Sequence, residues 1–383
     1  MSRRTLTSPE FQLACACAAT PAAPDRVREI AAGVDWGLFA KIVARHRIDG
    51  LAQRALDEAG LAVPEQVRSR ARSTALAALK LTAECWRLQE AFDAGGIALT
   101  FLKGPVLARL AYGDVGIRHS KDIDLFVGRG DVEAAWALLE ELGYTRVTPP
   151  KALAGDALAT FLQLSKDSTF VHGARGVEVE LHWRLTSSLE VAALAGAERQ
   201  RVDMGGVSLT TFSDEALFIY LCVHGSSHGW MRLKWLADIP ALMQRAPDAW
   251  RAAQGTAAEA PVEAALRLAS ELLGAPLPGD MPVSPGWRVQ ALMAVSRRSL
   301  SAGGGHVEPH RLAWGRLGEP LSELLMLRSP SAFARHLWRM SVPAEDVVLI
   351  RLPRGLVGLY PLLRLPLWVA KNLFGLGRPR RAG

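Results

Sequence analysis

Two aspartates, Asp122 and Asp124, alternate with apolar residues in the segment Lys121–Val127. Successive side chains of a strand point to opposite faces, so the two carboxylates would share one face. Neighbouring carboxylates repel each other unless a cation lies between them, and Mg²⁺ takes hard oxygen ligands of this kind. The pair therefore predicts a divalent metal site and chemistry on phosphates. The alternative is the polar outer face of an ordinary edge strand.

A second acidic segment, Val177–Trp183, repeats this pattern. Glu178, Glu180 and His182 would share one face of a strand, with apolar residues on the other. If this strand lies beside the one that carries the aspartates, three or four carboxylates converge and need a metal to stay ionised. We expect Glu180 to be the third metal ligand and Glu178 to be solvated or supporting.

The segment Lys103–Pro105 links an apolar strand directly to a short helix. Backbone N–H groups are unpaired at a helix start, and Pro105 costs nothing there, so the turn is a natural anion site. Lys103 adds a positive charge beside Gly104. Arg118, shortly before the aspartates, is a second candidate for phosphate contact. The alternative is an ordinary turn with a solvated lysine and a solvated loop.

Two histidines, His224 and His228, are four positions apart and would share one face of a helix. This spacing can bind a metal, but the HExxH frame of zinc enzymes is absent. We therefore expect a helix that lines the site or packs against it, rather than a zinc centre.

The segments that carry these residues alternate between strands and helices. The predicted strands are Ile97–Leu102, Asp122–Val127, Ser168–His172, Val177–Trp183, Arg201–Met204 and Val207–Thr211. The predicted helices are Asp35–His46, Ile48–Ala59, Pro64–Asp93, Pro105–Tyr112, Asp131–Leu142 and a stretch from Ser213 to about residue 245. The sequence thus predicts an α+β protein with a mixed sheet at 96–212. Helical regions at 1–95 and 213–345 flank this core, and a basic apolar tail follows at 346–383.

Composition and charge narrow the class of protein. The chain has 383 residues, of which 49% are apolar and 22% charged, as is typical of folded domains. Seven basic residues and no acidic one lie in Val347–Gly383, which accounts for the net charge of +7. The remaining chain is balanced, so a nucleic-acid partner is not indicated. The four cysteines lack CxxC spacing and indicate reduced, buried side chains.

Membrane contact is predicted only for the C-terminal part. The most apolar stretch, Gly355–Gly377, contains Arg364, Lys371 and two prolines, so it does not predict a spanning helix. We expect a cytoplasmic protein. The segment Leu352–Leu376 is apolar with spaced cations, which leaves peripheral membrane contact open as an alternative to docking on its own domain.

The order of a strand, a glycine turn, a helix, the motif DIDL and a later acidic strand resembles the DNA polymerase β-like nucleotidyltransferase fold. Three blocks in order, LKG…YGDVGIRHSKDIDLFV, VEVELHWRL and LCVHGSSHGWMRLKWLADI, are similar to a bacterial family of uncharacterised nucleotidyltransferases. The resemblance covers residues from about 30 to about 330. It implies that the central mixed sheet is nucleotidyltransferase-like.

The resemblance also implies an activity. The chain would transfer a nucleoside monophosphate from an NTP to an acceptor hydroxyl and use two Mg²⁺ ions. Asp122 and Asp124 would hold both ions, and Glu180 would complete the catalytic triad. The residues expected to contact the nucleotide or its phosphates are Lys103, Gly104, Arg118, Ser120, His228 and Lys234.

This sequence departs from the superfamily pattern beside the phosphate turn. Pro105 follows Gly104 where Gly or Ser is usual, and the distance from Gly104 to Asp122 is longer than usual. A weak or inactive nucleotide- or partner-binding module therefore stays open as an alternative, including an accessory role in polysaccharide or natural-product assembly at the membrane surface. The acceptor itself, whether small molecule, sugar or protein, has no signature in the sequence.

Overall fold

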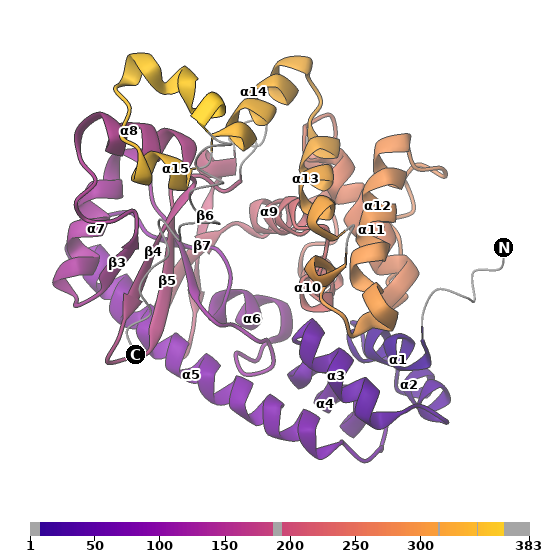
Figure 1. Cartoon of the computed structure of the whole chain (residues 1–383). Coiled ribbons are helices and arrows are strands. Elements are labelled where there is room, and N and C mark those ends of the chain that lie inside the picture. Colours follow the sequence, from indigo (N-terminus) through magenta and orange to yellow (C-terminus); the bar gives the residue numbers. More distant parts are fainter. Residues whose placement is uncertain (1–7, 187–193, 313–314, 343, 364–383) are drawn as a thin grey trace.

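The computed structural model describes residues 8–186, 194–312, 315–342 and 344–363. An α/β part built on one seven-stranded sheet lies beside a helical part (Figure 1). The strands are β1 (Thr100–Phe101), β2 (Ile123–Phe126), β3 (Thr145–Thr148), β4 (Asp167–His172), β5 (Val177–His182), β6 (Arg199–Asp203) and β7 (Ser208–Phe212). Their order in the sheet is β3-β4-β5-β2-β1-β7-β6. The α+β class with a central mixed sheet is thus confirmed.

The middle of the sheet mixes strand directions. β2 pairs in parallel with β5, and β1 pairs in parallel with β7, whereas the β1–β2 pair is antiparallel. The outer pairs β3–β4, β4–β5 and β6–β7 are antiparallel. The parallel neighbours β2 and β5 are the two strands in which the sequence carries its acidic residues.

Two hydrophobic cores lie on opposite faces of the sheet. Ile123 and Leu125 of β2 enter a core with the helices α5 (Glu65–Ala94), α7 (Val132–Glu141) and α8 (Gly155–Leu164). Phe126 of the same strand enters a second core with α6 (Pro105–Tyr112), α9 (Asp214–Ser227) and α10 (Leu233–Arg245). The alternation of side chains along β2 therefore directs its polar residues towards the face that α9 and α10 cover.

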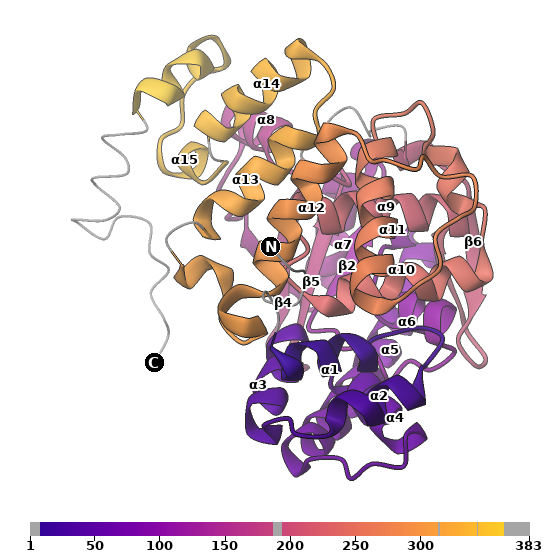
Figure 2. The same ribbon diagram turned by 90° about the vertical axis from the view of Figure 1, so that its right-hand side faces the viewer.

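The helical part joins both ends of the chain in one core. Its helices are α1 (Pro9–Cys17), α2 (Pro24–Ala31), α3 (Trp36–His46), α4 (Asp49–Glu58), α11 (Glu259–Leu273), α12 (Trp287–Leu300) and α13 (Gly315–Met326). Figure 2 shows α1 to α4 gathered below α10, α11 and α12. The buried guanidinium of Arg45 donates hydrogen bonds to the carbonyl oxygens of Ser299 and Leu300, each at 2.6 Å. The first and the later helices thus form one unit.

The chain then returns to the α/β part. Helices α14 (Pro330–Ser341) and α15 (Ala344–Leu349) lie near α8 (Figure 1). Tyr360 is fully buried there, and its hydroxyl donates a hydrogen bond to the carbonyl oxygen of Ile350. This part of the predicted tail docks on its own domain, whereas residues 364–383 lie outside the described residues. Within the described ranges, every helix is too short or too polar to span a lipid bilayer.

Most predicted elements are present, and the differences are local. The helix Pro105–Tyr112 has the predicted bounds, while the strand expected at Ile97–Leu102 is reduced to two residues. The strand β3 and the helix α8 were not predicted. All four cysteines are buried and free, as predicted.

Candidate functional site

The pairing of β2 with β5 brings two carboxylates together. In the parallel register, Asp124 lies opposite Glu180. Ligand atoms of Asp124, Glu180 and His182 all lie within 4.8 Å of one another. Asp124 is buried and Glu180 is partly exposed, so this cluster opens to solvent on one side. The sequence predicted that these carboxylates converge if their two strands are neighbours, and the structure shows that they are.

His182 lies between the acidic side chains. Its Nε2 atom is 3.5 Å from Asp124 Oδ1 and 3.5 Å from Glu180 Oε2, and its Nδ1 atom is 3.7 Å from Asp167 Oδ2. Both ring nitrogens are buried, and neither has a hydrogen-bond partner among the described residues. His182 was predicted to share a strand face with Glu180, but it was not predicted to be a ligand. Its position two residues after Glu180 was the available signal.

Lys103 supplies the positive charge at the centre of the cluster. Its Nζ atom is 3.0 Å from Asp124 Oδ1 and 3.4 Å from His224 Nε2. Burial alone would raise the pKa of the Asp124 carboxyl, but Lys103 and His182 outweigh burial and hold this pKa well below its usual range. Burial and the nearby Lys103 lower the pKa of His224, so this imidazole is neutral. Helix α9 therefore lines the site through His224.

Asp122 lies one residue before β2 and outside the group of converging ligand atoms. Burial, followed by the negative charges of Asp124 and Glu180, raises the pKa of its carboxyl. The Asp122 carboxyl is thus close enough to interact electrostatically with Asp124 and Glu180. Its role as a metal ligand stays a prediction.

The turn before α6 has the geometry expected of a strand-to-helix anion site. Gly104 has a φ of +73°, a conformation that side chains with a Cβ rarely adopt, and it directly precedes the helix that begins at Pro105. A Cβ added at Gly104 would lie 4.0 Å from Ser120 Oγ. Ser120 therefore lies beside the turn, and contact of either residue with phosphate stays a prediction.

Arg118 is engaged by an acidic partner that the sequence analysis did not pair with it. Its guanidinium donates to both carboxylate oxygens of Asp238, at distances from 2.8 to 3.1 Å, and both residues are buried. The hydroxyl of Tyr112 donates to the same carboxylate at 3.0 Å. This network ties the loop before β2 to α10. Direct contact between Arg118 and phosphate stays a prediction.

Lys234 and His228 each contact a residue outside their own helix. The Lys234 ammonium donates to the carbonyl oxygen of His119 at 3.0 Å. Burial and the nearby cation Arg118 lower the pKa of Lys234 well below its usual range. The His228 ring packs edge-on against the His224 ring, with ring centroids 4.7 Å apart, and its Nδ1 atom is 3.0 Å from Glu319 Oε1 of α13. The structure thus places both predicted phosphate contacts at the border with the helical part.

A sequence model of the family described as "Uncharacterised nucleotidyltransferase" matches residues 32–278. The chain belongs to this family. The matched residues include β2, β5, the turn at Gly104 and α9, which together form the cluster described above. Searches of curated proteins and of solved structures find no match.

The donor atoms of this cluster fit a divalent cation. Two carboxylates and an imidazole converge, and the buried ring nitrogens of His182 lack hydrogen-bond partners among the described residues. Carboxylate oxygens suit Mg²⁺ and Mn²⁺, whereas an imidazole ligand is also typical of softer transition metals. Asp124, Glu180 and His182 are thus the residues that could hold a metal.

Proposed function

We propose that the chain transfers a nucleoside monophosphate from an NTP to an acceptor hydroxyl in a reaction that depends on Mg²⁺. One observation carries the proposal: Asp124 and Glu180 lie opposite each other on parallel strands, beside Lys103 and the Gly104 turn. Membership of a nucleotidyltransferase family supports the reaction class. The metal, its number of ions and the acceptor are parts of the proposal.

The carboxylates would hold the metal. Asp124 and Glu180 contribute oxygen ligands, and Asp122, one residue before β2, would add a third carboxylate. A divalent ion bound there neutralises phosphate charge and makes an acceptor hydroxyl easier to deprotonate. The partly exposed Glu180 is the carboxylate best placed to accept that proton, because Asp124 is already engaged by Lys103.

The turn at Gly104 would position the triphosphate. The first N–H groups of a helix have no partner within it, and Lys103 directly precedes the Gly104 turn that opens α6. In the reaction, the acceptor oxygen forms a bond to the α-phosphorus and the bond to the bridging oxygen breaks. Pyrophosphate leaves with the electron pair of that bond. Such transfer depends mainly on positioning and on neutralisation of charge.

Transfer of label tests this proposal directly. Incubation with NTPs labelled at the α-phosphate, in the presence of cell extract and Mg²⁺, should label an acceptor. Asp124→Asn and Glu180→Gln should each abolish labelling. Glu133→Gln changes an exposed carboxylate on α7 and serves as the matched control. Labelling that persists in Asp124→Asn would contradict the assignment of the metal site.

A binding module without catalysis is the second candidate, and one contact favours it. The Lys103 ammonium lies 3.0 Å from Asp124 Oδ1 and could take the place of a cation there. In that case NTP would bind without release of pyrophosphate. Pyrophosphate release measured alongside NTP binding, in the same extract, separates the two candidates.

A further inference from the structure

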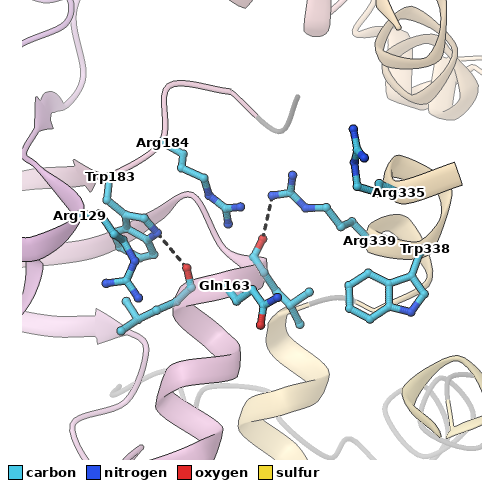
Figure 3. A pocket seen from close by; sticks show the side chains of 9 residues that line it. Arg129, Gln163, Trp183, Arg184, Arg335, Trp338 and Arg339 are labelled. Atoms are coloured by element: carbon cyan, nitrogen blue, oxygen red, sulfur yellow. Dashed lines mark hydrogen bonds between the residues drawn. The ribbon is translucent and has the colours of Figure 1, made fainter. Parts of the chain in front are cut away.

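A pocket of about 420 Å³ adjoins the strand that carries Glu180 and His182. It lies between the end of α8, the residues after β5 and helix α14 (Figure 3). The residues that line it are Arg129, Leu162, Gln163, Leu164, Trp183, Arg184, Arg335, Trp338 and Arg339. Four of these nine residues are arginines and none is acidic.

Two of the arginines face each other across the pocket. Arg184 extends from the strand end and Arg339 from α14, and their guanidinium groups point toward one another (Figure 3). Each donates a hydrogen bond to a carbonyl oxygen at the end of α8, Arg184 to Ser165 and Arg339 to Leu164. The Nε atom of Arg184 is buried without a hydrogen-bond partner among the described residues. Burial, followed by the charges of Arg339 and Arg129, lowers the pKa of Arg184 to about 10.

The other two arginines are exposed at the two sides of the pocket. Within the described ranges, neither Arg129 nor Arg335 has a hydrogen-bond or ion-pair partner. They flank the facing pair, Arg129 beside Trp183 and Arg335 on α14 (Figure 3). Their charges are therefore available to a ligand, which would also relieve the repulsion between the partly buried guanidinium groups of Arg184 and Arg339.

Apart from Gln163, the remaining walls are apolar. Trp183 is buried and packs against Trp136 with ring centroids 6.1 Å apart, while Trp338 is 37% exposed. Leu162 and Leu164 complete this surface. A ligand that fits the pocket must thus combine a multiply charged anionic group with an apolar or aromatic body.

We propose that this pocket binds an organic phosphate, with the phosphate held by the arginines and the body against the tryptophans. Guanidinium groups match phosphate oxygens in pairs, and phosphate carries more than one negative charge. The pocket is close to the candidate site, because the backbone N–H groups of Trp183 and Arg184 both donate to the carbonyl oxygen of Lys166, one residue before Asp167. If the proposed function holds, a hydroxyl of the organic phosphate is the acceptor.

Calorimetric titration with phenyl phosphate, without metal, tests the pocket. The wild-type chain should bind phenyl phosphate and should not bind phenol. The double variant Arg129→Gln/Arg335→Gln should bind phenyl phosphate at least tenfold more weakly. Both side chains are exposed, so the variant should fold. The matched control is Arg72→Gln/Lys80→Gln, which removes the same charge from exposed positions on α5.

A second arm separates the pocket from the metal cluster. Asp124→Asn should keep the binding of phenyl phosphate even though it should lose nucleotidyl transfer. Vesicles with phosphatidic acid, compared with vesicles of phosphatidylcholine alone, show whether the phosphate comes from a lipid. Binding that depends on Arg129 and Arg335 supports the site, whether the ligand is phenyl phosphate or phosphatidic acid. Two results would overturn the proposal. One is unchanged binding in the arginine double variant, and the other is a wild-type chain that binds neither phenyl phosphate nor phosphatidic acid.

Discussion

The ion pair between Lys103 and Asp124 should stabilise the fold as well as the site. Their charged atoms are 3.0 Å apart, and their side chains are only 13% and 6% exposed. With an effective dielectric constant of about 20, the attraction at this distance is about 5.5 kcal/mol, which the loss of hydration offsets in large part. Lys103→Met removes the attraction but leaves Asp124 buried beside Glu180. We expect the free energy of unfolding to fall by about 3–5 kcal/mol, as for other broken buried pairs.

Urea unfolding of the single and double variants measures this effect. Asp124→Asn removes the opposite charge, so Lys103→Met should cost much less in that background, with a coupling of about 1–3 kcal/mol between the two positions. Mg²⁺ should stabilise Lys103→Met more than the wild-type chain, because the freed Asp124 oxygen becomes available to a cation. Lys80→Met on α5 is the control for an exposed lysine. An unfolding free energy of Lys103→Met equal to that of the control would refute the reasoning.

Three further predictions concern residues around the site. Burial raises the pKa of Asp49 to about 6; an acid whose folded pKa lies above its unfolded value destabilises the fold once ionised. Asp49→Asn should therefore leave the free energy of unfolding nearly unchanged near pH 4 and raise it by up to about 3 kcal/mol at pH 7. Equal shifts of the urea midpoint at both pH values would contradict this. Gly225→Ala would place its Cβ 2.4 Å from the Trp230 ring, so it should lower the melting temperature by several degrees, whereas an unchanged melting temperature would show that the ring moves freely. Arg118→Met leaves the Asp238 carboxylate buried without its partner and should cost about 3–5 kcal/mol in urea unfolding; Arg118→Met/Asp238→Asn should recover part of that loss, and no recovery would argue against a direct pair.

The faces of the two acidic strands could be predicted from the sequence, since alternation alone assigns Asp124 and Glu180 to polar faces. The register between them could not be predicted, because β2 and β5 are far apart in sequence and nothing local specifies which strands pair. The same limit applies to Arg118 and Asp238, which are 120 residues apart. Either residue by itself resembles a solvated charge on a loop or helix, and only the fold shows that they neutralise each other.

His182 shows a different limit. Its type and spacing were visible, but a histidine at the end of a strand is as compatible with packing as with ligation. Among the described residues, neither ring nitrogen has a hydrogen-bond partner, while Asp124 on β2 and Asp167 on β4 both approach the ring. Both approaches depend on strand pairing, which the sequence does not specify. The length of β1 was overestimated, because the strand includes only Thr100 and Phe101, although Leu99 and Leu102 beside them are also buried.

The union of the first and later helices in one core makes the α/β part an insertion within a helical unit. Residues up to about 58 share this core with residues near 300, so the helical unit is complete only after both have been synthesised. The family match ends at residue 278 and begins at residue 32. A fragment cut at those limits would lack α1, α12 and the carbonyl groups that satisfy Arg45. Such a fragment would retain every residue of the acidic cluster but would lack part of the helical core.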